Sequence, residues 1–124
     1  MNQAIDLSLK GVEENYGGPF GSIIVKDGKI IGRGNNRVTS NHDPTAHAEV
    51  LAIREACSNL GSHELKGCIM YSTCEPCPMC LGAIYWARLE TVFYAATRED
   101  AAKSGFDDAF IYEQIGLEPK KTED

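Results

Sequence analysis

The stretch CEPCPMC places a cysteine at every third position, at Cys74, Cys77 and Cys80, with two prolines between them. Thiols this close together can form a disulfide cluster, a redox pair or a metal site. A second short stretch, HAE, brings an imidazole at His47 and a carboxylate at Glu49. Because imidazole and thiolate are ligands that zinc prefers, the two stretches together could hold one metal ion.

A catalytic zinc site with His47, Cys77 and Cys80 as ligands is the favoured interpretation. Three protein ligands leave one tetrahedral position for water, which is the pattern of catalytic rather than structural zinc. Zinc lowers the pKa of such a water to about 7. A zinc ion with two thiolate ligands does not need Glu49 as a further ligand. A carboxylate beside the zinc-bound water could instead take its proton and pass it to a substrate.

Two other uses of these residues remain open. A structural zinc would have four protein ligands, with Cys74 as the fourth, and would leave Glu49 without a role. A thioredoxin-like redox pair would need Cys77 and Cys80 but not the HAE stretch. We expect Cys74 to be a loop residue near the site rather than a ligand. We expect the other two cysteines, Cys57 and Cys68, to lie in the core. The other two histidines, His42 and His63, are expected in solvated loops.

Hydrophobic periodicity and turn signals predict the elements that position these residues. The predicted order is helix, β-hairpin, helix, strand, helix, strand and helix. The approximate ranges are 4–12, 22–25 with 29–32, 46–60, 68–72, 78–89, 91–96 and 107–116. His47 and Cys77 therefore lie at the starts of the two middle helices, where free N–H groups and the helix dipole favour thiolate.

The order of the elements predicts an α/β fold. Strands that alternate with helices pair in parallel through right-handed crossovers, so we expect a mixed sheet, antiparallel at its hairpin, with helices on both faces. The helix at 46–60 should bury the positions that recur at spacings of three and four, which are Ala46, Val50, Ile53, Cys57 and Leu60. Residues 1–124 are expected to form a single domain.

The composition limits the partners and the location that we expect. The chain is 43% hydrophobic and 24% charged, which is typical of a soluble globular protein. No apolar run approaches the roughly 20 residues that span a bilayer, and MNQAIDLSLK is neither a secretory signal nor a transit peptide. These features predict a cytoplasmic protein without a membrane partner. The net charge of −6 disfavours nucleic acid and favours a small-molecule partner.

The two chemical stretches match the H-x-E…P-C-x-x-C signature of zinc nucleobase deaminases, with HAE at 47–49 and PCPMC at 76–80. The chain thus resembles the cytidine deaminase superfamily. Within it, the stretches GGPFGSIIVKDG, NHDPTAHAEV, CEPCPMCLGAIYWAR, VFYAA and GFDDAFIY look like the bacterial guanine deaminases, from about Gly17 to Tyr112. The tRNA adenosine deaminases share DPTAHAE and EPCPMC, so the stretch from YWAR to GFDD is the most specific part.

The resemblance implies a cytidine-deaminase-like three-layer sandwich, one Zn²⁺ per chain and a homodimer. It also implies hydrolysis of guanine to xanthine and ammonia, as part of purine metabolism. Zinc would be bound by His47, Cys77 and Cys80, and Glu49 would transfer the protons. Substrate contacts are implied for Phe20, Asn36, Ala48, Trp86 and Asp108.

Asp108 carries the implied preference for guanine. A carboxylate only accepts hydrogen bonds. Guanine offers two neighbouring donors, at N1 and at its exocyclic amine, and adenine lacks this pair of donors. From the residues alone, Phe20 and Trp86 would instead be expected in the core. The bacterial guanine deaminases continue beyond residue 124, and we expect the chain to lack that C-terminal segment, which can be exchanged between subunits.

Two other functions remain open. The first is a deaminase of the same fold that acts on tRNA adenosine or on another nucleobase or nucleoside. The second is a binding module that zinc stabilises and that has no catalytic activity. The negative net charge and the GFDD stretch favour a guanine deaminase over these two alternatives.

Overall fold

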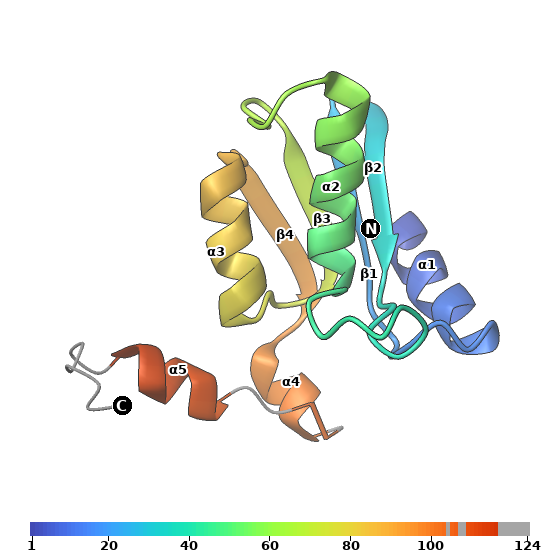
Figure 1. The fold of residues 1–124 in the computed structure, drawn as a ribbon, viewed down its shortest axis with the longest axis vertical. Coiled ribbons are helices and arrows are strands. Elements are labelled where there is room, and N and C mark those ends of the chain that lie inside the picture. Colours follow the sequence, from blue (N-terminus) through green and yellow to red (C-terminus); the bar gives the residue numbers. More distant parts are fainter. Residues whose placement is uncertain (104, 107–108, 117–124) are drawn as a thin grey trace.

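The computed structural model describes residues 1–103, 105–106 and 109–116 (Figure 1). The helices and strands are α1 (Asn2–Glu13), β1 (Gly21–Lys26), β2 (Lys29–Asn35), α2 (Ala48–Leu60), β3 (Ile69–Cys74), α3 (Pro78–Ala87), β4 (Thr91–Ala96), α4 (Arg98–Lys103) and α5 (Ala109–Gly116). Within these described ranges, none of the helices is both long and apolar enough to cross a membrane.

The strands form one mixed sheet in the order β2-β1-β3-β4. β1 is antiparallel to both β2 and β3, whereas β3 and β4 are parallel and are joined through α3. The turn between β1 and β2 consists of Asp27 and Gly28, whose φ angles of 50° and 77° are those of a tight hairpin turn. The predicted hairpin and the predicted parallel pair are therefore both confirmed.

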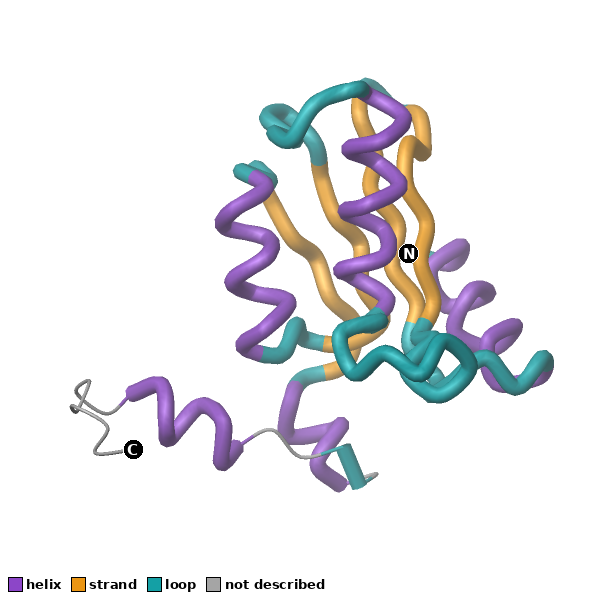
Figure 2. The backbone as a smooth tube through the Cα atoms, in the orientation of Figure 1, coloured by secondary structure: helices purple, strands orange, loops and turns teal. Residues whose placement is uncertain are grey.

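Two glycines show how the helices lie against the sheet. A Cβ atom at Gly21 would collide with the carbonyl of Ala4 in α1, and a Cβ atom at Gly34 would collide with the carbonyl of Ala48 in α2. Gly34 pairs with Ser22, the residue after Gly21, and successive residues of a strand point to opposite faces. α1 therefore covers one face, while α2 and α3 lie side by side on the other (Figure 2). The α/β fold with helices on both faces is confirmed.

The face that α2 buries differs from the predicted stripe. The buried helical residues are Ala48, Glu49, Ala52 and Ala56, while Val50, Ile53, Cys57 and Leu60 are only half-buried. Gly32 and Gly34 of β2 have no side chain that would hold the helix away, so the alanines pack directly on the strand backbone. Ile53, Cys57 and Leu60 instead border the core that contains Ile24, Leu65 and Met70.

α4 is an element that the sequence analysis missed. Its start is a capping box: Thr97 donates from its backbone N and from Oγ1 to Asp100 Oδ2, at 3.0 and 3.1 Å, and Asp100 N donates back to Thr97 Oγ1 at 3.2 Å. The last predicted helix is present as α5, and residues 107–108 of its predicted range lie outside the described residues.

Candidate metal centre and substrate cavity

Two helix starts meet at the carboxyl end of the parallel strands. His47 is the N-cap residue of α2 and Cys77 is the N-cap residue of α3, and both have extended backbone angles. Pro78 follows Cys77 at the first position of α3, where its missing N–H costs nothing. The His47 side chain makes no capping hydrogen bond to α2, whereas the Cys77 sulfur is hydrogen-bonded to Cys80 in the first turn of α3. The two N-cap side chains also meet each other, with His47 Nδ1 3.5 Å from Cys77 Sγ.

The distances between the three candidate ligands fit a zinc ion. His47 Nδ1 lies 3.5 Å from Cys77 Sγ and 3.5 Å from Cys80 Sγ, and all three ligand atoms lie within 4.8 Å of one another. Tetrahedral zinc with ordinary Zn–N and Zn–S bonds requires N···S separations of about 3.5 Å. His47, Cys77 and Cys80 thus have both the chemistry and the spacing of a site with three protein ligands.

The electrostatics of the cluster also suit a cation. A hydrogen bond from the Cys80 thiol, with a smaller contribution from His47, lowers the pKa of Cys77 to about 4. The same bond, together with burial, raises the pKa of Cys80. The hydrogen bond to Cys77 raises the pKa of His47. Cys77 is therefore the sulfur that ionises more readily, and a metal cation at the cluster would favour the thiolate form of both cysteines.

Glu49 lies in the first turn of α2, two residues after His47, and is only 7% exposed. It is not part of the three-residue metal cluster, yet it lines the same cavity. Burial raises the pKa of its carboxyl above the ordinary value. A buried carboxyl group with a raised pKa can hold a proton and return it, which suits proton transfer to a bound substrate.

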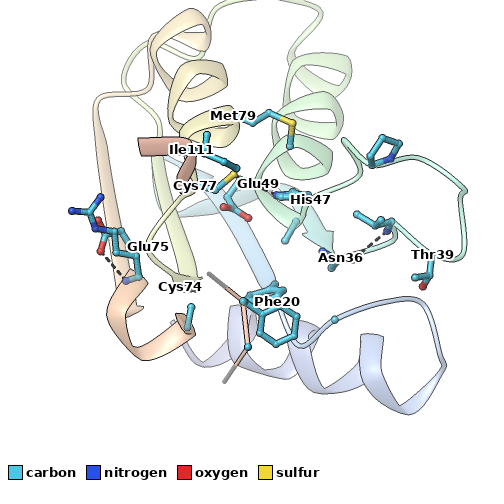
Figure 3. A pocket seen from close by; sticks show the side chains of 18 residues that line it. Phe20, Asn36, Thr39, His47, Glu49, Cys74, Glu75, Cys77, Met79 and Ile111 are labelled. Carbon is cyan, nitrogen blue, oxygen red and sulfur yellow. Dashed lines mark hydrogen bonds between the residues drawn. The ribbon is translucent and has the colours of Figure 1, made fainter. Parts of the chain in front are cut away.

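A cavity of about 630 Å³ opens beside the cluster (Figure 3). Two sets of residues from different parts of the chain line it. The packed wall consists of Asn36, His47, Ala48, Glu49 and Cys77. The helical wall consists of Arg98, Ala101, Gly105, Phe106 and Ile111. A volume of this size accommodates a small heterocycle.

Asn36 is held in one orientation on the packed wall. Its Oδ1 accepts a hydrogen bond from Val38 N at 3.1 Å, and its own backbone N donates to the carbonyl of Phe20 at 3.1 Å. A Cβ atom at Gly17 would overlap the Asn36 side chain, so only glycine fits beside it. The bond from Val38 N to the Asn36 oxygen fixes the orientation of the amide group. Its NH₂ group is then the part that can donate to a ligand.

An aromatic pair lies in the cavity lining and connects the segment before β1 with the helical wall. Phe20, which precedes β1, meets Phe106 edge to face with ring centroids 5.0 Å apart. Phe20 was expected to contact substrate and does line the cavity. Phe106 was missed, although it stands inside the quoted GFDD stretch. Its position in that specific stretch was a signal that could have identified it.

Of the other residues predicted to contact substrate, Ala48 lines the cavity and Trp86 does not. Trp86 lies at the end of α3 opposite to Cys77 and is 80% exposed. The structure therefore separates it from the cavity that the resemblance implied, and the alternative expectation that Trp86 belongs to the core is wrong. Asp108 lies outside the described residues.

The remaining cysteines and histidines lie largely where the sequence predicted. Cys74 ends β3 and lines the cavity, but it is not one of the three clustered ligands. Cys68 is buried, Cys57 is half-buried, and none of the five cysteines forms a disulfide. His42 and His63 are exposed.

Comparisons with known proteins point to the same chemistry. Residues 1–96 match the family model of the cytidine and deoxycytidylate deaminase zinc-binding region. The guanine deaminase of Bacillus subtilis (strain 168) is 61% identical over 115 residues, which cover 93% of this chain and 74% of that protein. A tRNA-specific adenosine deaminase of Aquifex aeolicus (strain VF5) is 51% identical over 78 residues, or 63% of this chain and 52% of that protein.

Solved structures agree with these relatives. The crystal structure of guanine deaminase from Bacillus subtilis superposes with a TM-score of 0.94 at 57% identity, covering 99% of this chain and 78% of that one. A second protein, solved in complex with 2,6-diaminopurine, has a TM-score of 0.83 at 30% identity and covers 97% of this chain and 63% of that one.

Proposed function

This chain belongs to the cytidine and deoxycytidylate deaminase family, and from that premise we propose that it hydrolyses free guanine to xanthine and ammonia. The carrying observation is the position of Glu49, buried in the wall of a cavity beside a cluster of one imidazole and two thiols but outside that cluster. A structural zinc site has no use for a buried acid at that place.

The cavity residues have different roles in the proposed reaction. Zinc held by His47, Cys77 and Cys80 would supply hydroxide at neutral pH. Glu49 would take one proton from the attacking water and pass it to a ring nitrogen as the oxygen adds to C2. It would then move the second proton from the added hydroxyl group to the amine, so that the C2–N bond breaks and ammonia leaves. The Glu49 carboxyl does not need to bind the metal for either transfer.

Recognition of the base rests on the neighbours of the metal cluster. The amide nitrogen of Asn36 donates to an acceptor atom of the purine, and Phe20 provides an apolar edge. We assign guanine specificity to Asp108 from its place in the sequence, because a carboxylate pairs with the N1 and amine donors of guanine. Adenine lacks that pair of donors and would leave the carboxylate unsatisfied.

The same proposal extends to assembly and location. Large apolar side chains are exposed on α3 and β4, at Trp86, Phe93 and Tyr94, as is typical of protein interfaces, and we propose a homodimer. Sedimentation showing a stable monomer would contradict it. Cysteines without disulfide bonds are typical of a reducing compartment, which supports a cytoplasmic enzyme of purine metabolism. The net charge of −6 supports a small-molecule substrate rather than nucleic acid.

An ammonia-release assay tests the proposal. Purified protein of measured zinc content is incubated with guanine, adenine, cytidine or a tRNA anticodon stem-loop. We expect one zinc ion per chain and ammonia from guanine alone. Release from the stem-loop but not from guanine would replace this proposal with tRNA adenosine deamination. Zinc-loaded protein that releases no ammonia from any of the four would favour a binding module.

A further inference from the structure

The loop that carries the metal ligand Cys77 is held from outside at two successive residues. Glu75 N donates to the carbonyl of Ala96 at 2.8 Å, and Glu75 Oε1 accepts from Arg98 N at 3.0 Å. The carbonyl of Pro76, the residue before Cys77, accepts a hydrogen bond from Tyr112 Oη at 2.9 Å. These partners all come from the end of β4 or from the helices after it.

Arg98 and Tyr112 also contact each other. The Arg98 guanidinium lies over the Tyr112 ring, 4.3 Å from its centroid, and its Nε lies 3.5 Å from Glu99 Oε1. A cation over the face of the ring restrains the ring, and this helps to keep the hydroxyl group at Pro76. We call the three contacts Tyr112–Pro76, Arg98–Tyr112 and Arg98–Glu75 the loop anchor.

The loop anchor helps to shape the cavity because the helical wall has little apolar packing of its own. Neither α4 nor α5 has a buried residue among those described, so little apolar packing holds the two helices in place. Yet this segment supplies Phe106 and Ile111 to the cavity. Hydrogen bonds to the metal-binding loop therefore have a larger share in setting the distance between the helical wall and the metal cluster.

We propose that Tyr112, whose ring Arg98 restrains, is a positioning residue, which holds the helical wall against the metal-binding loop and thereby sets the affinity for the substrate base. This inference rests on the proposed function. Tyr112 acts through Pro76 and through the wall, and it is not itself among the residues that line the cavity. Its loss should therefore weaken binding of the base while leaving the reacting groups in place.

The test compares Tyr112→Phe with Tyr85→Phe. The first change removes only the hydroxyl group and keeps the ring under Arg98. The control removes the same group from Tyr85, which is 69% exposed at the far end of α3. We expect Tyr112→Phe to raise the KM for guanine about five- to tenfold, the order of one hydrogen bond, with kcat and zinc content unchanged. Tyr85→Phe should match the wild type.

A second readout does not depend on turnover. In the Glu49→Gln background, adding Tyr112→Phe should weaken equilibrium binding of guanine by the same factor. Hydrogen exchange of residues 109–116, measured by mass spectrometry, should become faster with Tyr112→Phe and not with Tyr85→Phe. Adding Glu75→Ala to Tyr112→Phe should raise KM by less than the product of the single effects, because both changes release one wall.

The outcomes separate this inference from the proposed function. An unchanged KM in Tyr112→Phe, or a lowered kcat with an unchanged KM, would overturn the positioning role. Wild-type protein that releases no ammonia from guanine would contradict the proposed function instead, and hydrogen exchange would still test whether the anchor holds α5.

Discussion

The two walls of the cavity are built in different ways. The packed wall stands on α2, whose Ala48, Ala52 and Ala56 are buried against the glycines of β2. The helical wall stands on α4 and α5, which bury no described residue and are held by the loop anchor and the Phe20–Phe106 contact. The reacting groups thus lie on the wall with the more rigid support.

This difference suggests a division of roles. Backbone packing at close range leaves little freedom, so His47 and Glu49 keep a fixed position relative to the sheet. A wall held by a few polar and aromatic contacts can move at a smaller energetic cost. Changes in the packed wall should therefore affect chemistry and folding, and changes in the helical wall should affect substrate affinity.

The largest expected effect is on the packed wall, from Glu49→Gln. The amide has nearly the same shape as the carboxyl group but cannot accept and return the proton, so kcat for guanine should fall by about 10²- to 10⁴-fold. Zinc content should stay at one per chain, measured by atomic absorption on the assayed sample. Loss of zinc in this variant would show that Glu49 is a ligand and that its assigned role is wrong.

A glycine change tests how closely the packed wall is built. Gly34→Ala would place a methyl group against the carbonyl of Ala48, and the displacement of α2 should lower the free energy of unfolding by about 1–3 kcal/mol. Gly82→Ala in α3 is the matched control, because a Cβ atom there meets nothing within 4 Å. It should stabilise the helix by up to about 1 kcal/mol. Urea unfolding measures the free energy of unfolding of both variants. Equal values for the two would contradict close packing of α2 on β2.

The helical wall should respond in the opposite way. Phe106→Ala removes the edge-to-face contact with Phe20, so the KM for guanine should rise about three- to tenfold. The free energy of unfolding should change by less than about 1 kcal/mol, since Phe106 is already 46% exposed. Phe110→Ala, at a 69% exposed position of α5 outside the cavity, should change neither quantity. A large loss of stability in Phe106→Ala would mean that this wall is packed like the other.

The smallest effect concerns the capping box of α4. The backbone N–H of Thr97 lowers the pKa of Asp100 below its ordinary value. Because the folded pKa lies below the unfolded value of about 3.9, this stabilisation is present at neutral pH and is lost as the pH falls through the folded pKa. Asp100→Asn should lower the melting temperature of zinc-free protein slightly at pH 7, and the difference from the wild type should persist to about pH 4 and shrink as the pH falls further. A constant difference would exclude the carboxylate as its cause.

Local signals in the sequence predicted most of the fold. The Asp27-Gly28 turn, Pro78 at the start of α3 and the β-rich runs each depend on a few neighbouring residues, and the corresponding elements are present. The pairing of the HAE and PCPMC stretches was also predictable, because both stand at helix starts. The distance of 3.5 Å from the His47 imidazole to each sulfur is what the sequence alone could not supply.

The errors arose where distant parts of the chain meet. The stripe on α2 was chosen by side-chain size, whereas Gly32 and Gly34 decide which face can approach the sheet and favour the small alanines. Trp86 was expected in the core from the residues alone, but α3 carries it to the end opposite to Cys77, where it is exposed. α4 was different, since the residues TRED at 97–100 are a local capping signal that the sequence analysis did not use.

The start of α2 and the start of α3 share a consequence of their N-cap residues. At most helix starts a serine, threonine or aspartate side chain satisfies a backbone N–H of the first turn, whereas here the N-cap residues His47 and Cys77 are candidate metal ligands. A chelator that removes zinc would therefore release the starts of both helices from a shared ligand at the same moment. Metal loading and the ordering of these two turns should then titrate together, with a single midpoint.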